Sequence, residues 1–174
     1  MRATKRRPSI GSIAQGAAAG AVGTMAMDLV WYARYRRGGG DEGFLDWELS
    51  RSTKSFDDAG APAQVGRRIA KTLFRTDLPS TAAAATNNVV HWSTGVQWGA
   101  IYGVALGSLD TTSPLFGLAL GPLAWGASYA VLGQAKVYKP IWEYDAKTLA
   151  KDLSAHLVFG IATAGTFRAL TNRR

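Results

Sequence analysis

Residues 95–107 read GVQWGAIYGVALG and place a glycine at every fourth position, at Gly95, Gly99, Gly103 and Gly107. Glycine costs an ordinary water-exposed helix roughly 1 kcal/mol relative to alanine, so four glycines in register need a compensating gain. Helices in a lipid bilayer associate through close backbone packing, and rows of small residues permit that approach. The stretch therefore predicts a helix that packs against another helix inside a membrane.

Four segments of the 174-residue chain are almost free of charged side chains, and they decide the fold class. Residues 10–33 contain only Asp28, and residues 80–109, 111–135 and 153–167 contain none. About 20 predominantly apolar residues cross the hydrocarbon core of a bilayer. We therefore predict an all-α, four-transmembrane-helix bundle with Gly-rich packing grooves, formed as a single integral membrane domain by residues 1–174. The expected spans are about 10–33, 86–109, 113–135 and 148–170, with a long loop at 38–79.

Three other classes compete with this interpretation. The uncharged segments are rich in Ala, Gly, Ser and Thr, so a soluble helical bundle stays open. The basic head and small residues near Ala26 resemble a cleavable signal peptide, but the apolar run resumes after Asp28 and favours one longer helix. The net charge of +8 would suit a protein that binds nucleic acid. The basic residues are scattered between uncharged segments, however, so we expect no binding of nucleic acid. The chain has no cysteine, which excludes disulfides and thiolate sites.

The long loop is expected to hold one short helix, from about Pro62 to Phe74. Val65, Ile69 and Leu73 would share one face, while basic residues populate the rest. This pattern predicts an interfacial amphipathic helix on anionic headgroups, with a solvated helix packed on the loop as the alternative. Ser113 is expected to cap the third span, and Pro122 is expected to kink it.

Rows of residues spaced by four carry small side chains and end in polar ones. The expected packing residues are Gly16, Gly20, Gly95, Gly99, Gly103, Gly107 and Gly160, and the polar residues on the same rows are Asp28, Asn87, His91, Asp152 and His156. With four sequential spans, all five polar residues lie toward the same membrane side. Ionisable groups at membrane depth are expensive and turn toward partners or water. We therefore expect Asp28 to lie near His91 or His156.

The predicted polar layer has three readings. It could be a hydrogen-bonded layer that fixes the register of the bundle. It could be a proton or ion relay, because histidine titrates near neutral pH. It could also hold a metal or perform catalysis, although no HExxH-type spacing is present. We predict no catalytic residue, no metal ligand and no cofactor.

The segments GAAAGAVGTMAMD (16–28), APAQVGRRIA (61–70) and NNVVHWSTGVQWGAIYG (87–103) resemble the YagU-like family of small bacterial inner-membrane proteins of unknown function. The resemblance spans most of the chain. It implies a multi-pass protein of the bacterial cytoplasmic (inner) membrane, with a link to acid tolerance in part of the family. No catalytic residue is carried over by it.

Together these observations predict a small integral membrane protein, not an enzyme, that supports proton or ion homeostasis through the Asp/His layer. One alternative is a structural, assembly or oligomerisation subunit without transport. A second alternative is an intramembrane metal-dependent enzyme. The lipid bilayer is the expected partner, together with a homo-oligomer formed through the glycine grooves.

Overall fold

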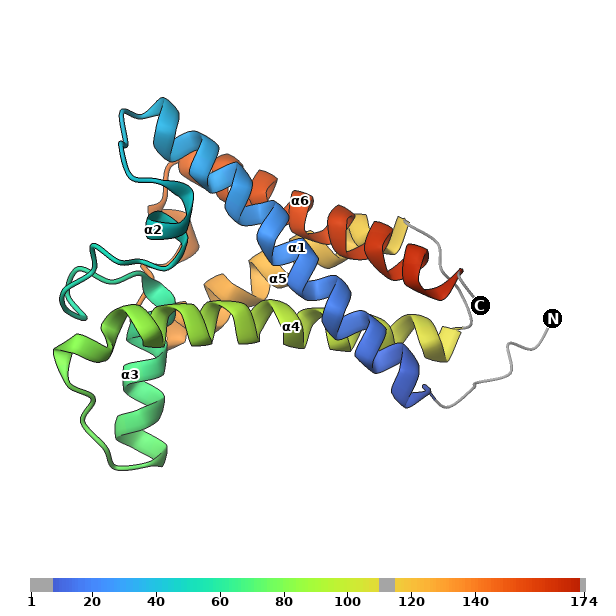
Figure 1. The fold of residues 1–174 in the computed structure, drawn as a ribbon, viewed down its shortest axis with the longest axis horizontal. Helices are drawn as coiled ribbons and strands as arrows, with labels where there is room; N and C mark the ends of the chain where they lie inside the picture. The colour runs from blue at the N-terminus through green and yellow to red at the C-terminus, as the bar shows by residue number, and fades with distance from the viewer. Residues whose placement is uncertain (1–7, 110–114, 173–174) are drawn as a thin grey trace. The chain divides into compact units, whose positions relative to one another are not determined.

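The computed structural model describes residues 8–109 and 115–172, and within these residues the chain is helical without any strand. Figure 1 shows the helices in chain order. They are α1 (Ile10–Arg37), α2 (Phe44–Glu48), α3 (Ala61–Leu73), α4 (Ala83–Leu109), α5 (Leu115–Gln134) and α6 (Ala146–Thr171), with short 3-10 turns η1 (Ser80–Ala82) and η2 (Ile141–Glu143). The all-helical prediction is confirmed.

Three of these helices, α1, α5 and α6, are long and apolar enough to cross a membrane. Three of the four predicted segments therefore form helices that could span a membrane by length and composition. The remaining segment, α4, has 27 residues and no charged side chain, but Asn87, Asn88 and His91 lower the hydropathy of its first half. α4 is long enough to cross a membrane, but it is not one of the three helices that are also apolar enough to do so.

The helix bounds follow the sequence prediction closely. α1 ends at Arg37 before three glycines, where Gly39 adopts a positive φ of 94° that ends the helix. α3 covers Ala61–Leu73, within one residue of the predicted helix at each end. α5 runs without interruption through Pro122. The predicted start of the third span at residue 113, with its capping Ser113, lies outside the described residues.

The chain divides into two compact units. In the described residues, the first unit contains 8–29, 94–109, 115–126 and 146–172, and the second contains 30–93 and 127–145.

The core of the first unit combines alanines with aromatic rings and two leucines. The Tyr102 and Phe167 rings meet edge to face, with centroids 5.5 Å apart. The buried core residues are Ala19, Tyr102, Leu106, Leu120, Ala124, Phe159, Ala164 and Phe167. Large aliphatic side chains lie instead on the outside of the same helices, at Val22, Leu29, Ile101, Val104, Leu118, Leu123 and Ile161. Large aliphatic side chains on the outer surface suit helices surrounded by lipid, whose tails are equally apolar.

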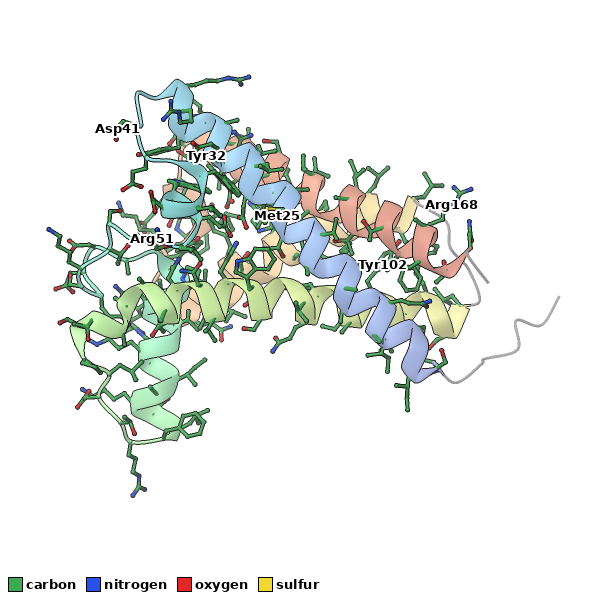
Figure 2. The ribbon with its side chains drawn as sticks, in the orientation of Figure 1. Met25, Tyr32, Asp41, Arg51, Tyr102 and Arg168 are labelled. Carbon is green, nitrogen blue, oxygen red and sulfur yellow. The ribbon has the colours of Figure 1, made fainter. Side chains whose placement is uncertain are left out.

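In the second unit, aromatic rings gather where α1 ends. The rings of Phe44 and Trp47 on α2 lie 5.2 Å and 5.4 Å from the ring of Tyr32, which is labelled in Figure 2. The Tyr32 hydroxyl donates to the Glu42 carbonyl oxygen at 3.0 Å, and the Glu42 amide donates to the Tyr35 hydroxyl at 3.2 Å. These contacts fold the chain back after α1. A second small cluster consists of Phe56, Ala63 and Ala83.

Candidate functional site

Asp28 is the most deeply buried acidic side chain of the candidate set. It lies on α1 and is 4% exposed. It completes the row predicted from the sequence, and every member of that row is buried: Ser12, Gly16, Gly20, Thr24 and Asp28. A carboxylate removed from water needs compensating partners. A buried aspartate on an apolar helix such as α1 is therefore a candidate functional residue.

Asp152 and His156 form a pair on one face of α6. The His156 Nδ1 atom lies 3.3 Å from the Asp152 Oδ1 atom and 3.0 Å from the Asp152 carbonyl oxygen. Both side chains are more than four-fifths buried. A carbonyl oxygen can only accept a hydrogen bond, so Nδ1 carries the hydrogen in this geometry. In the neutral imidazole the Nε2 atom is then the ring nitrogen that can accept a hydrogen bond.

The contacts between α1 and α6 fix their direction and register in the first unit. A Cβ atom at Gly23 would lie 2.8 Å from the Phe159 carbonyl oxygen and would also meet Thr163. Gln15 donates from its side-chain nitrogen to the Leu170 carbonyl oxygen at 3.2 Å. Moving backward on α1 therefore moves forward on α6, so the two helices are antiparallel, as Figure 1 also shows.

This register relates Asp28 to the α6 pair. Gly23 lies opposite residues 159–163, and Asp28 follows Gly23 by five residues. Because both helices rise by about 1.5 Å per residue, Asp28 is level with the segment five residues earlier on α6, residues 154–158. That segment contains His156. The structure thus places two of the predicted polar groups at one level of the first unit.

Asn87 and His91 belong to the second unit, where Asn87 contacts the loop. Its side-chain nitrogen donates to the Ser50 hydroxyl at 3.1 Å. A Cβ atom at Gly60 would lie 3.1 Å from the Asn87 Oδ1 atom, so the loop passes closely over this amide. His91 is half-buried on the same helix. The Asn87 contact is that of a residue that holds the loop in place.

The predicted packing glycines of α1 and α4 lie where the two backbones approach. A Cβ atom on Gly16 would lie 2.8 Å from the Gly103 Cα atom, and one on Gly20 would lie 2.8 Å from the Gly99 Cα atom. Gly95 faces the Thr24 side chain, and Gly107 faces the side chain of Ser12. Real Cβ atoms are not found so close to a neighbouring backbone, so a side chain at Gly16, Gly20, Gly99 or Gly103 requires the helices to separate.

A second close approach, between α5 and α6, was only half predicted. Gly160 was expected, and a Cβ atom there would lie 2.7 Å from the Gly121 nitrogen. Its partners Gly117 and Gly121 were missed. A Cβ on Gly121 would lie 2.5 Å from the carbonyl oxygen of His156. The signal was present in the sequence, because Gly117 and Gly121 are also four residues apart.

Two buried hydroxyl groups of the first unit were not singled out from the sequence. The Tyr102 hydroxyl and the Thr163 Oγ1 atom are buried, and neither finds a hydrogen-bond partner among the described residues. Buried hydroxyls are normally hydrogen-bonded to protein or to water. These two groups add polar character to the interior of the unit that carries Asp28 and His156.

A metal centre receives no support from side-chain placement. Within residues 8–109 and 115–172, no group of three or more His, Asp or Glu side chains is arranged to hold a metal ion. Two ligands on one helix, as at Asp152 and His156, are fewer than a structural or catalytic zinc site uses.

Comparisons with models of protein families, with curated proteins and with solved structures found no match.

Proposed function

We propose that the chain is a four-span integral membrane protein of the bacterial cytoplasmic membrane, in which α4 crosses the bilayer with α1, α5 and α6. The absence of charged side chains from α4 and its length of 27 residues support this, because about 20 residues suffice to cross. The close backbone approach of Gly20 to Gly99 supports packing of α4 within a membrane bundle. The resemblance to YagU-like proteins agrees with the proposed location.

Within this membrane protein, we propose that Asp28 and His156 take part in proton movement. The observation that carries the proposal is the burial of Asp28, at 4% exposure, on a helix that is apolar enough to span a membrane. A charged aspartate within a spanning helix is unfavourable, so such residues mark ion and proton pathways. A carboxyl group carries a proton when it is neutral, and it becomes a charged carboxylate when it releases that proton.

His156 supplies a second proton-carrying group at the level of Asp28. The Asp152 carboxylate and carbonyl oxygen hold its Nδ1 atom, which leaves the Nε2 atom to exchange protons. The buried hydroxyls of Tyr102 and Thr163 lie in the same unit. Such hydroxyls can bind water, and water can extend a proton path between side chains.

A structural role is the second candidate, and two observations favour it. The glycine contacts between α1 and α4 serve packing without any chemistry. The bond from Asn87 to Ser50 fixes a loop. In this candidate function, Asp28 and His156 would only stabilise the register of the helices.

Proton flux into proteoliposomes separates the two functions. The protein is reconstituted into vesicles that contain a pH-sensitive dye, and a membrane potential drives proton entry. The proposal expects flux in the wild type, loss of flux in Asp28→Asn with the fold retained, and unchanged flux in the control Asp57→Asn, whose carboxylate is exposed. Absence of protein-dependent flux, or equal flux in wild type and Asp28→Asn, would reject proton movement and leave the structural role.

A further inference from the structure

The C-terminal end of α3 exposes large apolar side chains beside basic ones. Leu73 is 74% exposed, Phe74 is 72% exposed, and Ile69 precedes Leu73 by one helical turn. Lys71 and Arg75 are exposed next to them. We name these five residues the α3 tip. A tip of this composition exposes apolar area that a water-facing loop would normally hide.

The remaining basic residues of α3 are held by the protein, which separates them from the tip. The Arg67 guanidinium lies over the Phe56 ring, 5.2 Å from its centroid. The Arg68 guanidinium donates to the Ala135 carbonyl oxygen at the end of α5. These contacts anchor the middle of α3, whereas Lys71 lies in its last turn and Arg75 just beyond its end. Lys71 also lies 3.6 Å from Asp77 in an exposed pair.

The packing of α3 on α4 sets the direction in which the tip points. A Cβ atom on Gly66 would lie 2.9 Å from Val90 and would also meet Thr86, so α3 rests on the first turns of α4. Figure 1 shows α3 running crosswise to α4. Because α3 packs across the first turns of α4, a crossing of the bilayer by α4 would bring α3 to the membrane surface. Leu73 is seven residues beyond Gly66, about 10 Å further along the helix axis.

We propose that the α3 tip binds the surface of a bilayer that contains anionic phospholipids. Leu73 and Phe74 insert among the upper acyl chains, and Lys71 and Arg75 contact the phosphate groups. This proposal rests on the proposed crossing of the membrane by α4. The charge of the tip is complementary to an anionic surface, since its two basic residues, Lys71 and Arg75, outnumber the one neighbouring acidic residue, Asp77. Amphipathic helices with this arrangement bind anionic membrane surfaces.

The test uses the full-length protein with a fluorescent label at the tip. The chain has no cysteine, so Leu73→Cys creates a unique attachment site. The label is an environment-sensitive dye, and the bilayer carries a quencher attached to its acyl chains. Vesicles of phosphatidylcholine alone are compared with vesicles of phosphatidylcholine and phosphatidylglycerol. Ser52→Cys is the control position, because Ser52 is exposed in the same loop and is not one of the tip residues.

The expected result is stronger quenching and blue-shifted emission at position 73 in the anionic vesicles, with no response at position 52. Arg75→Gln should lower the ratio of inserted to exposed label about fivefold, since one basic residue near an anionic surface contributes about 1 kcal/mol. Lys54→Gln removes an exposed charge elsewhere in the loop and should have no effect.

Three results would overturn the proposal. They are a label that stays in water in both vesicles, insertion that is equal with and without anionic lipid, and disulfide cross-linking between copies at position 73, which would show that a second copy covers the tip. Failure of the proton pathway is a separate outcome. Asp28→Asn should remove flux in the same vesicles while the response at position 73 persists.

Discussion

A Cβ atom added to Gly20 would lie 2.8 Å from the Gly99 Cα atom, and one added to Gly99 would lie 2.5 Å from the Gly20 Cα atom. The relationship is reciprocal, so neither glycine can accept a methyl group without moving the other backbone. Close contact between two backbones stabilises the packing of the helices through dispersion attraction. Such contact forms only where both residues lack a side chain.

Gly20→Ala should destabilise the protein by about 1–3 kcal/mol, because the added methyl group overpacks a backbone contact and the helices must separate. Thermal unfolding in detergent measures the effect. Gly165→Ala is the matched control, since a Cβ there meets nothing within 4 Å. It should be neutral or stabilising, because alanine favours a helix over glycine by up to about 1 kcal/mol. Equal stability of the two variants would show that α1 and α4 are not in contact at Gly20.

Trp92→Phe should loosen the loop that precedes α3. The Trp92 Nε1 atom donates to the Glu48 Oε1 atom at 3.0 Å, and phenylalanine cannot make this bond. We expect a loss of about 1 kcal/mol, because the bond has a charged acceptor but is only partly buried. Limited proteolysis measures the effect as faster cleavage between residues 49 and 60. Trp142→Phe changes an 82% exposed indole and should leave cleavage unchanged; equal cleavage in both variants would show that the Trp92 bond does not hold the loop.

The distribution of basic residues predicts the membrane orientation. Residues 34–75 and 136–151 together contain 13 Lys and Arg, against seven at the two ends of the chain. Cytoplasmic loops carry the excess of basic residues, so the α3 loop should face the cytoplasm and residue 174 the periplasm. Reporter fusions at Arg174 test this. A cytoplasmic signal from a fully inserted chain would contradict this orientation.

The long helices could be predicted from the sequence because their signal is local. Uncharged length defined α1, α5 and α6, and the glycines after Arg37 marked the end of α1. The helix α3 was found from the apolar spacing of Val65, Ile69 and Leu73. The five-residue helix α2 was missed, since its Phe44 and Trp47 are held by Tyr32, a contact that no local pattern encodes.

The residues of the candidate site could be predicted from the sequence, but some of their hydrogen-bond partners could not. The row that ends at Asp28 was visible as small residues spaced by four, and the pair of Asp152 with His156 follows from the same spacing on one helix. The bond between Asn87 and Ser50 joins residues 37 positions apart. It depends on how the loop folds back, which local patterns do not determine.

Infrared spectroscopy of the protein in bilayers can detect whether Asp28 takes up a proton, because the carbonyl stretch of a neutral carboxyl group reports its proton. A side chain that relays protons must occupy both its protonated and its charged form as pH is varied. We predict a pH-dependent carboxyl band that is absent from Asp28→Asn and kept in Asp57→Asn. A spectrum in which Asp28→Asn removes no pH-dependent band would contradict a relay through Asp28.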